Sequence, residues 1–143
     1  MKKKLRALSL SIGVVYLLFG ALKFVPNLSP AETIGSETVS VLFGGFITPS
    51  VSLLLLALLE VVIGTLLFST RTLRAGVLLA FFHMVMTFTP FLIFPDQTFS
   101  NYSIIAPSLL GQYIIKNIII ICALIVIYPE PKKTIKQNEY TYS

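Results

Sequence analysis

Three ionisable side chains lie within long apolar stretches of the chain, where a charge is costly. Glu60, His83 and Lys116 are surrounded in sequence mostly by leucine, isoleucine, valine and phenylalanine. A charged side chain near the centre of a bilayer costs about 2.5–3.5 kcal/mol on insertion scales. A carboxylate, an imidazole and an ammonium group can hydrogen-bond a polar ligand and transfer protons. These residues therefore predict a polar site inside an apolar helical bundle.

Each apolar run carries its small and polar residues on one stripe at helical spacing. Small residues let membrane helices approach closely, and polar residues avoid lipid, so we expect the stripes to face one another. The stripes comprise Gly13, Tyr16, Gly20 and Lys23 in the first run, Ala57, Glu60 and Gly64 in the second, Gly76, Ala80, His83 and Thr87 in the third, and Gln112, Lys116 and Ala123, with Asn117 beside them, in the fourth.

Depth along the runs predicts an ion pair between the second and fourth helices. A rise of about 1.5 Å per residue places Glu60 near the midplane and Lys116 in the outer third. A lysine stem reaches across a helical turn, so we predict a Glu60–Lys116 pair. Such a pair could form a functional site or only fix helix register. The candidate site, with Lys23 at its outer entrance, comprises Tyr16, Lys23, Glu60, His83, Thr87, Gln112, Lys116 and Asn117.

Composition requires that lipid, rather than water, surrounds most of this chain. Of the 143 residues, 55% are hydrophobic and 12% are charged, and the mean hydropathy is +0.87. Four runs, at 5–24, 51–69, 75–94 and 109–128, have the roughly 20 residues that span a bilayer. Backbone groups in lipid must be satisfied internally, so each run is expected to be a helix. The predicted fold is an all-α integral membrane four-helix bundle.

The basic residues predict one orientation in the membrane. The net charge is +5, but the lysines and arginines flank the apolar runs at 2–6, 71–74 and 132–136. Cytoplasmic loops carry such an excess, which places both termini inside. No aromatic and basic groove is visible, so we expect no nucleic-acid partner. With one histidine and one cysteine, neither a metal site nor a disulfide within the chain is expected.

Three segments outside the regular spans carry their own predictions. A capping box at Ser29-Pro30-Ala31-Glu32 and a stop at Gly44-Gly45 predict a short amphipathic helix in the first outer loop. Its apolar face is expected to include Ile34, Thr38, Val41 and Leu42, opposite Ser36 and Glu37. Thr87-Phe88-Thr89-Pro90 should bend the third helix, either to fit the bundle or to open it toward the outer leaflet. Residues 129–143 are expected to form a basic, disordered cytoplasmic tail after a domain at 1–128.

Several motifs resemble those of the DoxX-like small membrane proteins, in particular a bacterial subgroup. They are Phe19-Gly20-Ala21-Leu22-Lys23-Phe24, Leu59-Glu60-Val61-Val62-Ile63-Gly64, Thr87-Phe88-Thr89-Pro90 and, most specifically, Gly111-Gln112-Tyr113-Ile114-Ile115-Lys116-Asn117. The resemblance covers the chain from the first helix through the fourth. It implies a four-helix bundle in the bacterial cytoplasmic (inner) membrane and a link to membrane redox chemistry. No set of catalytic residues transfers with it.

Two functions from different classes remain open on the sequence. The first is a redox-associated subunit, quinone-linked or related to oxidative stress, that binds a quinone among its helices beside a redox partner subunit. Quinone reduction needs protons, which Glu60, His83 and Lys116 could supply. The second is a non-enzymatic scaffold or small permeation unit, which could form homo-oligomers. An enzyme acting alone is the least favoured interpretation.

Overall fold

Four long apolar helices form most of the computed structural model, which describes residues 2–25, 28, 32–100 and 103–129. In that part of the chain, the helical segments long and apolar enough to cross a membrane are Lys3–Leu22, Pro49–Phe68, Leu73–Ile93 and Leu109–Ile127. Each end lies within two residues of the corresponding predicted run. The four-helix membrane bundle is therefore confirmed as the fold, and the chain is an integral membrane protein.

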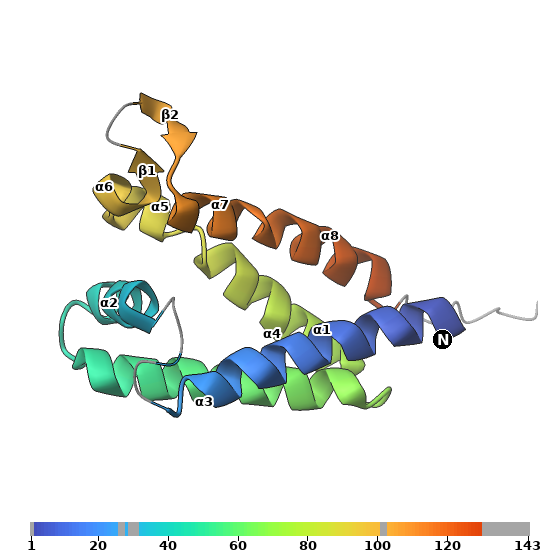
Figure 1. The fold of residues 1–143 in the computed structure, drawn as a ribbon. Coiled ribbons are helices and arrows are strands. Elements are labelled where there is room, and N and C mark those ends of the chain that lie inside the picture. Colours follow the sequence, from blue (N-terminus) through green and yellow to red (C-terminus); the bar gives the residue numbers. More distant parts are fainter. Residues whose placement is uncertain (1, 26–27, 29–31, 101–102, 130–143) are drawn as a thin grey trace, which may run out of the picture.

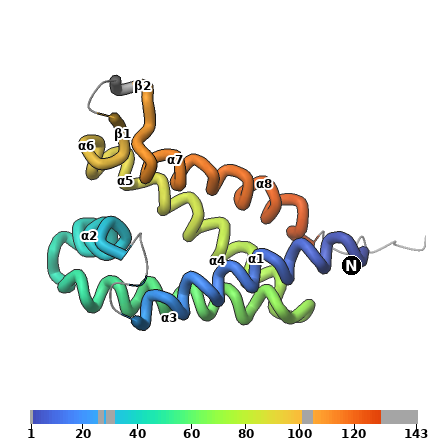
Figure 2. The backbone as a smooth tube through the Cα atoms, in the orientation of Figure 1, coloured from blue at the N-terminus to red at the C-terminus, as the bar shows by residue number. Residues whose placement is uncertain are grey.

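The helices pack as a group of three to which the fourth span is joined at one end (Figures 1 and 2). The second span packs against the first and the third. The fourth span consists of α7 (Leu109–Ile115) and α8 (Asn117–Ile127), and α8 also packs against the first and the third spans. The main neighbours of α7 are instead α8 and two elements of the preceding connection, α6 (Pro95–Thr98) and β2 (Ser103–Pro107), so the fourth span diverges from the first at that end. In chain order the elements are α1 (Lys3–Leu22), α2 (Glu32–Leu42), α3 (Pro49–Phe68), α4 (Leu73–Met86), α5 (Pro90–Ile93), α6 (Pro95–Thr98), β1 (Phe99–Ser100), β2 (Ser103–Pro107), α7 (Leu109–Ile115) and α8 (Asn117–Ile127).

Glycines bring the backbones of α1 and α3 into close contact. A Cβ atom added at Gly64 would lie 2.9 Å from the carbonyl oxygen of Gly13, and one added at Gly20 would lie 3.1 Å from that of Ala57. Side chains at these positions would force the helices apart. The small-residue stripes of the first two spans therefore face each other, as predicted.

The third span is interrupted at the predicted position. The Thr87 amide still bonds the His83 carbonyl, but the Phe88 and Thr89 amides bond carbonyls only three residues back, at 3.1 Å each. Pro90 then starts α5 without an N–H group of its own. The tightened turn separates α4 from α5 at the residues where the sequence predicts a bend (Figure 2).

The helix predicted in the first loop is present as α2, but its buried face differs from the predicted one. Ile34, Ser36 and Thr38 are buried, whereas Val41 and Leu42 are about half exposed. Ser36 tolerates burial because its hydroxyl donates to the Thr33 carbonyl at 3.0 Å. Packing against α3 therefore selects a face that includes short hydroxyl side chains. The predicted capping residues 29–31 lie outside the described residues.

Two glycines end α2 as the sequence predicts. Gly44 has a φ of +65°, and its amide bonds the Val41 carbonyl at 2.9 Å. The Gly45 amide bonds the Ser40 carbonyl at 2.9 Å. These two bonds form a Schellman motif, in which glycine adopts the left-handed conformation at no steric cost.

The connection between the third and fourth spans contains structure that the sequence analysis did not predict. After α6, β1 and β2 pair antiparallel, with Ser100 opposite Ser103. Ser108 then caps α7, since its hydroxyl accepts from the Gly111 amide at 3.1 Å and donates to the Gln97 carbonyl at 2.7 Å. This connection holds the start of α7 against α6.

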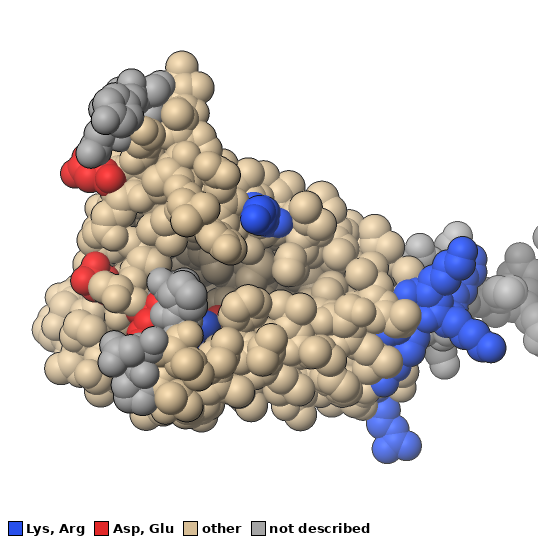
Figure 3. All heavy atoms as spheres, in the orientation of Figure 1, with Lys and Arg blue, Asp and Glu red and all other residues tan. Residues whose placement is uncertain are grey.

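Most of the exposed basic residues lie at the end of the bundle opposite the acidic residues of α2 and α6 (Figure 3). Arg6, Arg71 and Arg74 lie where α1 begins and where α3 meets α4, whereas Lys23 and Lys116 lie away from them, after α1 and α7. We call the end where α1 begins the basic end. There, Arg6 donates to the carbonyls of Leu67 and Phe68, and the Ser9 hydroxyl donates to Leu67 at 2.8 Å. Residues of α1 thus satisfy carbonyls at the end of α3.

Candidate functional site

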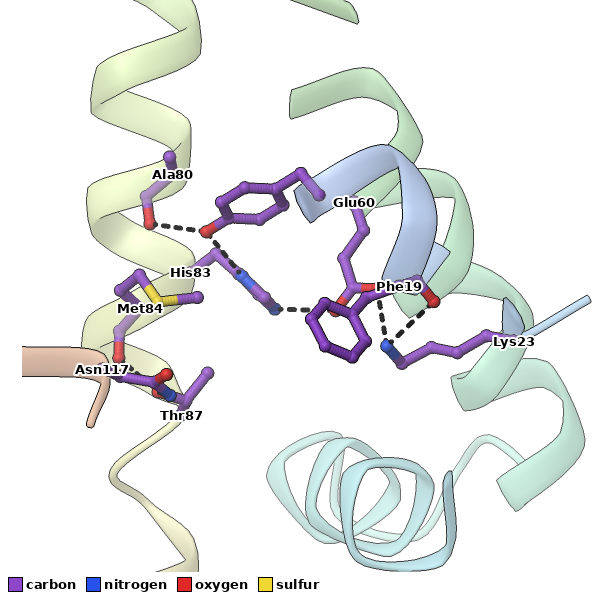
Figure 4. Close-up of polar contacts among 9 residues, drawn as sticks. Phe19, Lys23, Glu60, Ala80, His83, Met84, Thr87 and Asn117 are labelled. Carbon is purple, nitrogen blue, oxygen red and sulfur yellow. Dashed lines mark hydrogen bonds and ion pairs between the residues drawn. The ribbon is translucent and has the colours of Figure 1, made fainter. Parts of the chain in front are cut away.

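A buried ion pair joins α1 and α3 in the interior of the bundle. Lys23 Nζ lies 2.6 Å from Glu60 Oε2, and the two residues are 8% and 7% exposed (Figure 4). The close approach of the helices at Gly20, whose added Cβ would lie 3.1 Å from the Glu60 Cβ, brings the lysine stem within reach. Lys23 Nζ also donates to the Phe19 carbonyl at 3.4 Å. The ammonium group therefore turns back into the bundle.

His83 extends this arrangement onto α4. Its Nε2 atom faces Glu60 Oε1 at 3.7 Å, and the residue is 7% exposed. A distance of 3.7 Å is attractive for opposite charges but too long for a direct hydrogen bond. The carboxylate thus has a bonded oxygen facing Lys23 and a second oxygen facing His83 across a gap.

Tyr16 of α1 completes the polar cluster, which we define as Tyr16, Lys23, Glu60 and His83. The Tyr16 hydroxyl lies 3.1 Å from His83 Nδ1 and 3.3 Å from the Ala80 carbonyl oxygen. A phenol has one proton to donate, so it donates either to the carbonyl or to the imidazole. When it donates to the carbonyl, Nδ1–H of His83 can donate to the phenol oxygen. The position of the imidazole proton is therefore coupled to that of the Tyr16 proton.

A second polar contact joins α4 to α8. Asn117 Nδ2 donates to Thr87 Oγ1 at 2.8 Å, and the Thr87 hydroxyl donates to the Met84 carbonyl at 2.6 Å (Figure 4). Thr87 lies one helical turn beyond His83. This pair connects the fourth span to the helix that carries the imidazole, and it lies apart from the polar cluster itself.

The structure contradicts the predicted Glu60–Lys116 ion pair. Lys116 is exposed, and its ammonium lies 4.7 Å from the centroid of the Tyr113 ring. Gln112 is exposed as well and reaches only the Pro107 carbonyl, at 3.5 Å. The physical reason is that α7 diverges from α1 and α3, so its polar stripe does not face them. Of the eight predicted site residues, four form the polar cluster, two form the Thr87–Asn117 contact, and Lys116 and Gln112 join neither.

Sequence reasoning placed Lys23 at an entrance and missed its role as the partner of Glu60. The signal was present in the glycines, because Gly20 and Gly64 predict that α1 and α3 approach closely along their shared stripes. Lys23 lies three residues after Gly20, within reach of a carboxylate on the facing helix. The backbone partners at Phe19 and Ala80 carry no comparable sequence signal.

The arrangement can hold a polar ligand and move a proton, since it combines a carboxylate, an imidazole, a phenol and an ammonium group within apolar helices. Figure 3 shows the surface hollowed between α1 and α7, on the side where the fourth span diverges. Among the residues that the structure describes, no group of three histidine, cysteine or carboxylate side chains could hold a metal ion. Comparisons with known proteins give no family, no curated protein and no solved structure that matches this chain.

Proposed function

We propose that the polar cluster binds the polar head of a quinone-like lipophilic molecule, and that the chain is a redox-associated membrane subunit of the DoxX-like type. The observation that carries this proposal is the 3.7 Å gap between Glu60 Oε1 and His83 Nε2. Polar atoms of two buried residues face each other there at a distance too long for a direct hydrogen bond. An oxygen of a ligand could accept from His83 beside the carboxylate and so use that unfilled capacity.

The residues present fit a quinone head group. A quinone carbonyl accepts hydrogen bonds, and Lys23, His83 and Tyr16 each carry a donor. The ring and tail are apolar, as are the surfaces of the helices that carry the cluster. When bound, the quinone would supply the site that accepts electrons from a redox partner subunit.

The chain's own contribution would be to hold and move protons. With Tyr16 donating to His83 Nδ1, the imidazole carries its proton on Nε2, next to Glu60. With Tyr16 donating to the Ala80 carbonyl, the imidazole proton moves to Nδ1 and Nε2 becomes an acceptor. The cluster therefore has two hydrogen-bonded arrangements that differ in whether Nε2 can give or take a proton. Lys23 keeps the carboxylate charge compensated in the arrangement that leaves Glu60 ionised.

Charge supports a proposal for orientation too. We propose that the basic end faces the bacterial cytoplasm, with both termini on that side and with α2 and the β1–β2 hairpin outside. The arginines at the basic end, opposite Glu32, Glu37 and Asp96, support it. Cysteine labelling from outside tests this topology in cells that express the chain: Cys at Ser100 should react with an impermeant reagent, and Cys at Arg71 should not.

The ligand is tested by extraction and titration. Protein purified in mild detergent is extracted for bound quinone, and a water-soluble short-chain quinone is titrated against the wild type and Glu60→Gln. Glu60→Gln removes the charge that holds Lys23 and faces His83, so these donors are no longer positioned for the quinone carbonyl. A hydrogen bond from a charged donor such as Lys23 contributes about 1.5–3 kcal/mol, so we expect Glu60→Gln to bind roughly ten- to hundredfold more weakly. Lys116→Gln, which changes an exposed residue outside the cluster, should bind like the wild type. No extracted quinone and no measurable affinity in the wild type would refute the proposal.

A scaffold or small permeation unit is the second candidate. The observation that favours it is the apolar face of α8, where Ile119 is 71% exposed and Ile118, Ile125 and Val126 are at least half exposed. In a membrane this face contacts either lipid or another protein. A scaffold predicts that co-purifying subunits, or further copies of the chain, protect the cysteine of Ile119→Cys or Ile125→Cys from a lipophilic thiol reagent, each variant made in a Cys122→Ser background because Cys122 is exposed on the same helix. Full reactivity of both positions in native membranes would exclude that surface as an interface.

A further inference from the structure

An apolar groove runs along the outside of α4 and α8, away from the polar cluster. Its volume is about 290 Å³, and its walls are Val77, Leu78, Phe81, Leu124, Ile125 and Tyr128. Leu78 and Phe81 follow each other on one face of α4, and Leu124 and Tyr128 do so on α8, since these spacings return to the same side of a helix. The groove is therefore an open depression between two rows of apolar side chains, and its volume would take part of a flexible apolar chain.

One end of the groove carries a cation that is held in place. Arg74 lies one helical turn before Leu78, on the same side of α4. Its Nε donates to the Tyr128 hydroxyl at 3.3 Å, and its guanidinium carbon lies 5.6 Å from the centroid of the Tyr128 ring. Tyr128 is itself a wall of the groove. The guanidinium group is thus fixed where the groove ends, at the basic end of the bundle.

We propose that this groove binds one acyl chain of an anionic phospholipid, with the lipid phosphate on Arg74. Nε–H faces Tyr128, which leaves the two terminal nitrogens of a planar fork whose geometry matches that of phosphate oxygens. Arginine and tyrosine at the end of a membrane span lie at the depth of the headgroups. Charge complementarity identifies the occupant: the wall is apolar, the mouth is cationic, and an anionic phospholipid has the opposite charge at the matching position.

General attraction of a basic surface for anionic lipid would produce a less specific effect. Polybasic segments near a membrane attract anionic lipid whichever residue carries the charge. A built site depends instead on the one arginine that lies at the groove and on the groove itself. Arg71 supplies the matched control. It is an exposed arginine just before α4, whereas the exposed Arg74 bonds Tyr128 of the groove wall.

The test uses full-length protein in nanodiscs of phosphatidylcholine with a small fraction of spin-labelled phosphatidylglycerol. Electron paramagnetic resonance measures the immobilised fraction, with spin-labelled phosphatidylcholine of the same chains as reference. We expect the wild type to prefer phosphatidylglycerol about fivefold or more, Arg74→Gln to lose most of this preference, and Arg71→Gln to keep it. Leu78→Trp, which fills the groove and leaves both arginines in place, should reduce the immobilised fraction of both lipids.

Equal losses in Arg74→Gln and Arg71→Gln, or an unchanged immobilised fraction in Leu78→Trp, would overturn the proposal in favour of general surface attraction. Circular dichroism and thermal melts of each variant show that the bundle is intact. The result is independent of the polar cluster, since Glu60→Gln should leave the lipid preference unchanged.

Discussion

The first three spans and the fourth span of this bundle use their polar residues in opposite ways. In the first three spans the ionisable residues away from the basic end turn inward, so that Lys23, Glu60 and His83 are each less than a tenth exposed. In α7 and α8, Gln112 and Lys116 face outward, and Asn117 reaches only the end of α4, where its amide donates to the Thr87 hydroxyl. The same residue types at similar spacing therefore have different environments in the two parts.

The difference follows from what lies at the helix interfaces. Glycines at Gly13, Gly20 and Gly64 let α1 and α3 approach until backbone carbonyls meet the facing helix. The corresponding glycine of the fourth span, Gly111, packs instead against Thr98 and Pro107 of the preceding connection. A polar stripe thus points into the bundle only where small residues bring its helix against the others.

The largest expected effect is the difference in stability cost between substituting Lys23 and substituting Lys116. Lys23→Met leaves a buried carboxylate without its partner, and such a loss typically costs about 3–5 kcal/mol. Lys116→Met removes an exposed ammonium over an aromatic ring and should cost no more than about 1 kcal/mol. Unfolding in mixed detergent micelles with increasing dodecyl sulfate measures both. Equal costs for the two lysines would show that the two parts of the bundle do not differ as described.

A smaller effect tests the close approach of α1 and α3. In Gly64→Ala the new Cβ would lie 2.7 Å from Leu17 Cγ and 2.9 Å from the Gly13 carbonyl oxygen. Because a backbone atom cannot give way easily, we expect a destabilisation of about 1–3 kcal/mol in the same unfolding assay. The control is Gly35→Ala in α2, whose Cβ would meet only the end of the Leu56 side chain at 3.2 Å. If Gly64→Ala costs as little stability as this control, α1 and α3 do not approach as closely as described.

The smallest effect concerns the contact between α4 and α8. Asn117→Ala removes the donor to Thr87, and an interhelical hydrogen bond in a membrane protein contributes about 0.6–2 kcal/mol. Gln112→Ala, on the exposed side of α7, should change the stability by less than about 0.5 kcal/mol. A larger loss of stability in Asn117→Ala than in Gln112→Ala would support the assignment of Asn117 to an interhelical contact and of Gln112 to the exposed side. The reverse ordering would mean that Gln112 contacts the bundle interior.

The sequence predicted the spans well because length and hydrophobicity alone determine which segments can cross a membrane. The break before Pro90 and the end of α2 at Gly44 were also predictable, since proline and glycine act on the local backbone. The buried face of α2 was not, because tertiary packing against α3 decides it. The resemblance to DoxX-like proteins is a proposal that rests on the sequence motifs alone.

The sequence predicted which residues belong to the polar cluster, but it did not predict which of them pair. Helical periodicity assigns Tyr16, Lys23, Glu60 and His83 to inward stripes without fixing which helices are neighbours. The choice between Lys23 and Lys116 depends on the divergence of α7 from the first span, and that divergence depends on the connection of α6, β1 and β2. Those contacts join residues whose sequence pattern shows no periodic signal.

Coupling energies from double-mutant cycles measure most directly whether Glu60 pairs with the first span. The cycle of Lys23→Met with Glu60→Gln should give a coupling of about 1–3 kcal/mol, because the two groups are in contact. The cycle of Lys116→Met with Glu60→Gln should give a value within about 0.5 kcal/mol of zero. A large coupling to Lys116 together with none to Lys23 would contradict the polar cluster and return Glu60 to the fourth span.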